Sequence, residues 1–300
     1  MDRPPLAEDP GPAGLAKATP SGNLGRLAFG FLAACVVSGI ALTPFYSPAR
    51  ALDSLERLQG GLPWGFFLRA LHAFSGFGLL VATAGHLAQV LAARTERQLS
   101  APSWWRSVLL LPLLVAALLG GFVLRADAEA AAALPVWRHI VESVPLVGAE
   151  TARLVLGAAS GDLGAVALHH AGIFTILLWL LTSAHGNRLL PDRRSVILAG
   201  LASAALAGAV PLALGSSPGT SPASAGDHLL LGPWYLLGLQ GALVDLPVAI
   251  GWLGPLALVL FLGLMRHARE RVRSLLIALA ATWFAADFAY TVRLLLLARR

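Results

Sequence analysis

The stretch RALHAFSGFGLLVATAGHLAQV, from Arg69 to Val90, places two histidines in an otherwise oily segment. Every residue between His72 and His86 is apolar or small. About 20 such residues in a row can cross a bilayer as a helix. Ionisable side chains are rare inside membrane helices, where they mark functional positions. We therefore expect a membrane-spanning helix whose two histidines carry chemistry.

The composition of the whole chain is typical of a membrane protein. Of its 300 residues, 57% are hydrophobic and 13% are charged, whereas about 25% of the residues in a soluble domain are charged. The net charge of +6 comes almost wholly from arginines that lie between the apolar stretches. Such placement orients helices in a membrane and does not indicate nucleic-acid binding. Cys35 is the single cysteine, which excludes an internal disulfide and a cysteine-based metal site.

Hydropathy predicts an all-α membrane protein built as a seven-transmembrane helix bundle. The expected spans are 26–46, 66–93, 105–125, 163–187, 195–215, 247–266 and 273–296. Between the third and fourth spans, VWRHIVESV and AETARLVLGAA have apolar residues at helical spacing. These two segments indicate short helices that lie along the membrane surface. Residues 1–25 are rich in Pro and Gly, which is typical of a disordered tail.

The distribution of arginine predicts how the bundle is oriented. Arginines are concentrated in three short loops, at positions 94, 97 and 106, then 188, 193 and 194, then 266, 269, 271 and 273. The segment 216–246, on the opposite side, contains neither Lys nor Arg. Cytoplasmic loops carry the excess of positive charge. We therefore expect a multi-pass protein of the cell inner (plasma) membrane, with its N-terminus in the cytoplasm and its C-terminus outside.

The spacing of the histidines on two spans is the main functional signal. From His72 to His86 is fourteen steps, which is about 40° short of whole helical turns and a rise of about 21 Å. In the fourth span, His170 and His185 are fifteen steps apart and about 60° from the same face. The neighbouring His169 is about 160° from the face of His185, nearly opposite. Each span therefore presents two histidines on one face, near its two ends.

Two such helices can hold two flat metal macrocycles between them. His72 would pair with His170 near the outer side, and each ring would occupy one axial position. His86 would pair with His185 near the inner side in the same way. Ligation by imidazole on both sides suits electron transfer rather than oxygen binding. Any one membrane histidine taken alone is more often a hydrogen-bonded packing residue, but two matched pairs favour four metal-binding histidines.

Three further stretches are distinctive: SGIALTPFYSPARA, GFFLRALHAFSG with its Arg-x-x-His, and VPLVGAETARLVLGA. With the histidines, they resemble cytochrome b of the bc-type and chloroplast-type b/f quinol oxidoreductases, from about Gly25 to the C-terminus. The resemblance implies a four-helix di-haem domain over 26–194 and a three-helix domain over 195–300, fused in one chain. It also implies two non-covalent haem b groups with bis-histidine ligation, and quinone as the substrate.

The resemblance assigns further residues to the cofactors. Gly25, Gly39 and Gly121 match glycines that let haem lie against the backbone, because only glycine leaves room for the macrocycle edge. Close helix packing is the alternative role of the glycines. Arg69 matches an arginine for an outer-haem propionate, with a structural role as the alternative, and Arg188 is placed to reach an inner-haem propionate. The candidate quinone-site residues are Pro145, Gly148, Pro233, Trp234 and Tyr235.

The chain departs from the family at the outer quinone site. The family has a Pro-Glu-Trp-Tyr motif whose glutamate takes a proton from quinol, but here the stretch is GPWY. Pro233 occupies the glutamate position and cannot accept a proton. Asp127, Asp227 and Asp245 are candidate substitutes, and each is otherwise a solvated loop residue. We therefore expect the outer quinol site to be impaired, rebuilt or lost.

Two other positions also differ from the family. Asn23 stands where the b/f branch attaches an extra haem through a cysteine, so no covalent haem is expected. Ser107 stands where the third helix of the family usually has a glycine.

These observations predict a di-haem b-type cytochrome, the electron-transferring subunit of a bc-like membrane oxidoreductase. Its expected partners are membrane lipid, quinone and an iron–sulfur protein or cytochrome c, within a larger complex that contains a homodimer. The missing glutamate keeps a second interpretation open, in which a di-haem anchor passes electrons from another dehydrogenase or ferredoxin-like partner to quinone. A third interpretation is a haemless permease or scaffold with a relic cytochrome b fold.

Overall fold

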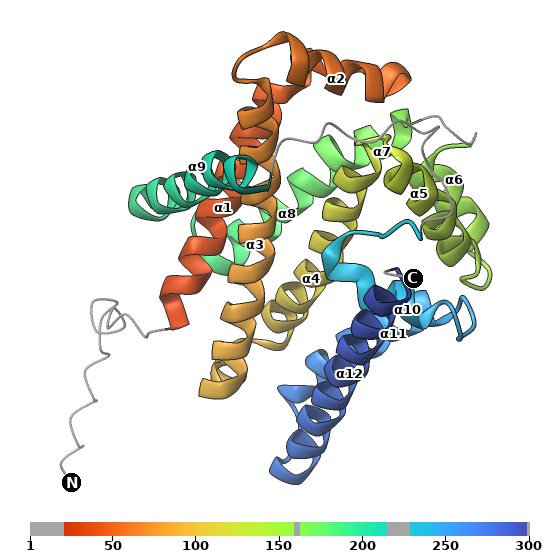
Figure 1. Ribbon diagram of the computed structural model, residues 1–300. Helices are drawn as coiled ribbons and strands as arrows, with labels where there is room; N and C mark the ends of the chain where they lie inside the picture. Colours follow the sequence, from red (N-terminus) through yellow and green to blue (C-terminus); the bar gives the residue numbers. More distant parts are fainter. Residues whose placement is uncertain (1–20, 159–162, 215–228, 299–300) are drawn as a thin grey trace, which may run out of the picture.

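A computed structural model describes residues 21–158, 163–214 and 229–298, and all regular structure within these residues is helical (Figure 1). Within them, five helices are long and apolar enough to cross a membrane. These helices cover Asn23–Phe45, Gly65–Ala93, Ala101–Val123, Gly164–Gly186 and Glu270–Leu297. The structure therefore confirms the all-α membrane class and the first four expected spans.

The first four apolar segments pack around a common core. They are α1 (Ser21–Leu42), α3 (Gly65–Ala93), α4 (Ala101–Val123) and the segment formed by α7 (Gly164–Leu168), η5 (His169–Phe174) and α8 (Thr175–Gly186). Their apolar faces meet in a buried cluster that includes Phe29, Leu32, Leu79, Leu114 and Leu178. Because α1 begins at Ser21, the helix includes residues 21–25 of the expected tail. Residues 1–20 lie outside the described part of the chain.

Three short amphipathic helices lie outside this core. The helix α2 (Ala51–Gly61) follows the 3-10 turns η2 (Thr43–Phe45) and η3 (Pro48–Arg50), and Figure 1 shows it across one end of α1 and α3. The helices α5 (Ala128–Glu142) and α6 (Gly148–Leu156) are too short to span a bilayer. They confirm the short helices expected between the third and fourth spans.

The segment η5 is a π-helix, a wider turn than the α-helices on either side of it. In a π-helix the backbone hydrogen bonds join residues i and i+5, so the chain turns less per residue than in an α-helix. Such turns are frequent at functional sites. The ideal α-helical offset of about 60° between His170 and His185 is therefore reduced. The Thr175 hydroxyl stabilises the turn by donating to the His170 carbonyl at 2.6 Å.

The remaining helices match the expected spans only in part. They are α9 (Arg193–Leu214), the turn η7 (Trp234–Leu236), α10 (Leu237–Ala242), α11 (Ile250–Met265) and α12 (Glu270–Leu297). Among them, α12 is the one that belongs to the candidate spans found in the described residues. With its 16 residues, α11 is about 24 Å long, shorter than the ~30 Å hydrocarbon core. Figure 1 draws α9 across α1 and α3, against which it packs. The count of seven spans therefore stays a prediction.

Side-chain bonds fasten the C-terminal helices to the first four. The buried Trp104 on α4 donates its indole N–H to the Leu262 carbonyl on α11 at 2.8 Å. At the same end of the molecule, the turn η4 (Thr95–Gln98) carries Glu96, which pairs with Arg273 of α12 at 3.3 Å. The Glu96 side chain is 0% exposed and that of Arg273 is 7% exposed. This ion pair is therefore an interior contact between two parts of the chain that are far apart in sequence.

Candidate functional site

The four candidate histidines meet in two pairs inside the four-helix core. We call His72 and His170 the first pair, and His86 and His185 the second pair. The ring centroids are 6.0 Å apart in each pair, with interplanar angles of 83° and 68°. The two members on α3 are separated by about 21 Å of helical rise. The structure thus brings together the histidines that the sequence pairs, at opposite ends of α3.

The separation within each pair suits a metal ion bound between two imidazoles. A metal–imidazole nitrogen bond is about 2 Å long, so rings that approach one ion from opposite sides keep their centroids several ångströms apart. The rings of each pair are set edge to face, with their centroids 6.0 Å apart. Among the described residues, no group of three or more His, Cys, Asp or Glu side chains gathers as a metal site. A metal held here would therefore have two protein ligands, and a planar macrocycle would supply the others.

The second nitrogen of three of these rings is held by a neighbouring helix. His72 Nδ1 lies 3.0 Å from the Cys35 carbonyl, and His170 Nδ1 lies 2.8 Å from the Ala117 carbonyl. His185 Nδ1 lies 2.7 Å from the Ser107 hydroxyl. A ring that donates from Nδ1 presents Nε2 as a lone pair, which is how metal-ligating histidines are oriented. These bonds fit a ligand role for the rings.

Three of the predicted glycines lie directly against these histidine rings. A Cβ at Gly39 would be 3.0 Å from the His72 ring, and one at Gly25 would be 3.0 Å from the His86 ring. A Cβ at Gly121 would be 2.9 Å from the His170 ring. The glycine pair on α1 and the histidine pair on α3 have the same interval of fourteen residues. Both proposed roles of the glycines, close packing and room for a cofactor, are compatible with these contacts.

A cavity of about 360 Å³ surrounds the first pair. Its walls are largely apolar, with Leu32, Val36, Leu79, Leu114, Leu118 and Leu178 among the lining residues. Two arginines, Arg69 and Arg125, also line it. Pockets for small organic ligands have volumes of ~300–1,000 Å³ and a few well-placed polar groups. The cavity therefore fits a flat apolar cofactor that carries anionic substituents.

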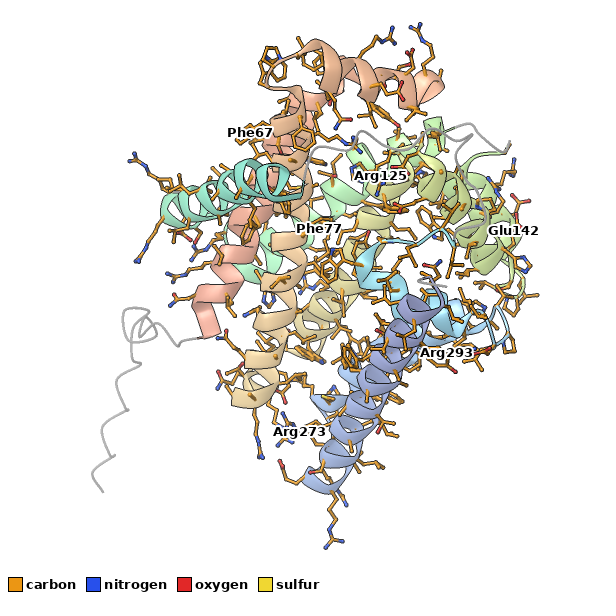
Figure 2. All side chains as sticks on the ribbon, viewed as in Figure 1. Phe67, Phe77, Arg125, Glu142, Arg273 and Arg293 are labelled. Carbon is orange, nitrogen blue, oxygen red and sulfur yellow. The ribbon has the colours of Figure 1, made fainter. Side chains whose placement is uncertain are left out.

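The two arginines of this cavity are each held by neighbours. Arg69 donates to Gln59 Oε1 at 2.7 Å. Arg125, at the end of α4, bonds to Asp127 and lies 3.1 Å from a Glu129 oxygen. Figure 2 shows Arg125 between the four-helix core and the surface helices. The sequence prediction included Arg69 but not Arg125. The one feature of the sequence that could have indicated Arg125 is its position as a single charge directly after the apolar third span.

The surroundings of the second pair are more open. Arg188, three residues after His185, pairs with Asp192 at 3.8 Å and remains 39% exposed. Gln89, three residues after His86, has a buried Oε1 without a hydrogen-bond partner among the described residues. Both side chains therefore offer polar groups near this pair.

Comparison with known proteins identifies the family to which this fold belongs. A family model described as cytochrome b/b6/petB matches residues 17–186, which is more than half of the chain and contains both histidine pairs. The chain belongs to the cytochrome b family. Membership implies binding of haem b, and the four-helix core is the part of the chain that the family model covers.

Individual relatives of the cytochrome b family are distant. Cytochrome b6 of Gracilaria tenuistipitata var. liui is 25% identical over 162 residues, which cover 53% of this chain and 75% of that protein. Cytochrome b of Schizosaccharomyces octosporus is 30% identical over 139 residues, covering 44% of this chain and 36% of that protein. A solved structure described as "Hyperthermophilic respiratory Complex III" aligns with 92% of this chain and 85% of that chain, at a TM-score of 0.64 and 19% identity. This likeness shows that the cytochrome b fold extends over the C-terminal helices.

The candidate quinone residues of this cytochrome b lie on two separate elements. Pro145 lies in the turn between α5 and α6, and Gly148 begins α6, where its N–H donates to the Val144 carbonyl at 3.0 Å. Trp234 and Tyr235 belong to η7, and Gln240 holds the preceding loop by accepting from the Gly232 N–H at 2.7 Å. In the described parts of the chain, neither a hydrogen bond nor a ring contact joins the two elements.

The turn η7 packs on the helix that carries two of the histidines. The ring centroids of Trp234 and Tyr235 lie 5.9 and 6.4 Å from that of Phe77 on α3, and Phe77 is labelled in Figure 2. Burial raises the pKa of the Tyr235 phenol, against a smaller lowering by the Arg125 guanidinium. Tyr235 is therefore a neutral hydroxyl, near Arg125 and able to donate a hydrogen bond.

The aspartates that the sequence offers as proton acceptors have other roles in the structure. Asp127 is 2% exposed, accepts from the Ala130 N–H at 3.0 Å as the N-cap of α5, and pairs with Arg125. Asp245 pairs with Arg293 of α12. Asp227 lies outside the described residues. The two described aspartates among these candidates are therefore held by structural contacts.

Proposed function

We propose that this chain is the di-haem membrane subunit of a bc-like quinol oxidoreductase, which carries electrons across the bilayer between quinone and a partner redox protein. One observation supports the proposal above all others. Two histidine pairs, each with ring centroids 6.0 Å apart, lie at opposite ends of the same helix. Two cofactors held there would form a transmembrane electron path.

The residues of the chain have defined tasks in this function. A haem held by these imidazoles would supply one-electron transfer without binding oxygen. The Nδ1 hydrogen bonds of His72, His170 and His185 orient their rings and would leave Nε2 available as the ligand atom. The apolar walls exclude water, and Arg69 and Arg125 supply positive charge for cofactor carboxylates in the first cavity.

The arrangement in the membrane follows the arginine distribution. The first pair then lies near the outer side of an inner (plasma) membrane, and the second pair lies near the inner side. The amphipathic helix α2 and the edge-on pair of Phe45 and Trp64, with centroids 5.3 Å apart, are typical of a membrane–water interface at the outer side. An iron–sulfur protein or cytochrome c would dock on this side, and the complex would contain two copies of the chain.

The first test of the proposal is the cofactor content of the purified protein. We expect two haem b groups per chain and a b-type absorption band on reduction. Acid–acetone extraction should remove all of the haem, because the chain has no cysteine at the position of covalent attachment. A folded protein purified from haem-replete cells without haem would disprove the proposal.

One departure from the family favours a second candidate function. Pro233 has no proton-accepting group, and a buried quinol site needs a base within hydrogen-bond reach. The chain would then be a di-haem anchor that passes electrons from another dehydrogenase or ferredoxin-like partner to quinone at the inner site.

Quinol reduction separates the two functions. With the inner quinone site blocked by an inhibitor, we expect added quinol to reduce the haem of the first pair in the intact complex, with Tyr235 hydrogen-bonding the quinol. Retention of that haem in the oxidised state, in a sample that dithionite reduces fully, would favour the anchor instead.

A further inference from the structure

Ser107 links α4 to the histidine of the second pair that lies on α8. Its hydroxyl lies 2.7 Å from His185 Nδ1 and 2.8 Å from the Ser103 carbonyl oxygen. A carbonyl oxygen can only accept, so the single hydroxyl proton of Ser107 points to Ser103. With its proton directed to Ser103, the Ser107 oxygen accepts a hydrogen bond from the N–H of His185 Nδ1. This chain of bonds fixes one tautomer of His185, with its lone pair on Nε2.

The partner of His185 differs in kind from those of the first pair. The closest acceptors of His72 and His170 are backbone carbonyls, those of Cys35 and Ala117, and the Ser38 hydroxyl lies farther from His72 Nδ1, at 3.3 Å. No side-chain substitution removes a carbonyl acceptor, whereas the acceptor of His185 is a hydroxyl that a substitution can delete. The hydrogen bonding of His185 can therefore be changed by a substitution at Ser107, while both histidines of the second pair are kept.

We propose that Ser107 is a positioning residue that orients His185 and sets the reduction potential of the iron bound by the second pair. The inference rests on the proposed di-haem function. A hydrogen bond from the distal ring nitrogen raises the basicity of a metal-ligating imidazole. A more basic ligand stabilises the ferric form, so the Ser107 bond holds the potential of this site down. Loss of the bond raises that potential and loosens the ring orientation.

The test compares Ser107→Ala, Ser107→Thr and Ser103→Ala in the intact, haem-loaded protein. Threonine keeps the hydroxyl at position 107, and Ser103→Ala keeps the backbone carbonyl while removing a neighbouring hydroxyl of the same helix. Redox titration should give two one-electron steps, assigned to the two sites by their low-spin ferric EPR signals. The first pair provides an internal control, because no hydrogen bond in the described residues joins Ser107 or Ser103 to its rings, whose closest acceptors are backbone carbonyls.

We expect Ser107→Ala to change the reduced-to-oxidised ratio of the second site by roughly threefold to tenfold at fixed potential, toward the reduced form, which is the size of one lost hydrogen bond. A tenfold change corresponds to about 59 mV for a one-electron couple. The EPR signal of that site should shift, while the first site stays unchanged. Ser107→Thr and Ser103→Ala should both resemble the unaltered protein. Loss of haem from the second site alone in Ser107→Ala, with retention in Ser107→Thr, would also support the proposal.

Three results would overturn this inference. In the first, both potentials and both EPR signals are unchanged in Ser107→Ala. In the second, Ser107→Thr shifts the second site as much as Ser107→Ala, which would assign the effect to packing. In the third, Ser103→Ala has the same effect. Failure of the di-haem function is distinguishable from all three, because the unaltered protein would then contain no pair of haem signals to compare.

Discussion

Replacement of His170 by alanine is expected to leave the purified protein with one haem per chain instead of two. His170 provides one half of the first pair, 6.0 Å from the ring of His72, and its Nδ1 is fixed by the Ala117 carbonyl at 2.8 Å. Alanine cannot ligate a metal, so the iron at this site would lose one of its two protein ligands. Quantitative pyridine-haemochrome assay, together with EPR, would show the loss of one low-spin ferric signal.

The neighbouring residue provides a matched control for this substitution. His169 is 6% exposed, and its Nδ1 donates to the Ala165 carbonyl at 2.8 Å, one turn back on its own helix. His169→Gln keeps a donor for that carbonyl, so we expect two haems per chain. Equal haem content in His170→Ala and the unaltered protein would rule out the assigned ligand. It would also favour the haemless permease or scaffold if that content were zero in both.

The second large effect concerns stability. Substitution of Arg273 by methionine is expected to lower the free energy of unfolding by about 3–5 kcal/mol, the typical cost of leaving a buried charge unpaired. Glu96 is fully buried, its Oε1 lies 3.3 Å from Arg273 Nε, and its Oε2 has no hydrogen-bond partner among the described residues. Reversible denaturation in mixed detergent micelles, followed by circular dichroism, would measure the change.

Two controls test whether the effect arises from the buried charge. Arg94 pairs with Glu270 at 3.1 Å while both side chains are 54% exposed, so Arg94→Met should cost less than about 1 kcal/mol. The double variant Glu96→Leu with Arg273→Met removes both charges, and replacement of a whole buried pair by apolar residues is often neutral. We expect it to recover most of the loss. Equal destabilisation by Arg94→Met and Arg273→Met would show that burial is not the cause.

The sequence predicts the histidine pairs well because their positions depend mainly on local geometry. Helical periodicity alone distinguishes His170 from His169, and the structure places the former beside His72 and the latter against its own backbone. Long apolar runs likewise predict the first four spans, because the bilayer imposes their length. The helices α5 and α6 follow from amphipathic spacing in the same way.

Features that depend on tertiary packing were not predictable from the sequence. The π-helical turn at His170 and the acceptors at Cys35, Ala117 and Ser107 require knowledge of which helix faces meet. The sequence places Arg125 in a loop after an apolar stretch. In the structure its side chain pairs with Asp127 and Glu129 and lines the first cavity. The short α11 and the crosswise α9 show that apolar composition alone does not determine the length of a helix or the direction in which it packs.

The matching intervals on α1 and α3 have a consequence for how this protein can evolve. Gly25 faces His86 and Gly39 faces His72. Both contacts can therefore form only while the spacing of the glycines on α1 equals the spacing of the histidines on α3. An insertion or deletion between the two glycines, or between the two histidines, would rotate one contact by about 100° and leave its counterpart in place. Changes of length in these segments should therefore survive only as compensated pairs, and homologous sequences should conserve the two intervals more strictly than the residues that fill them.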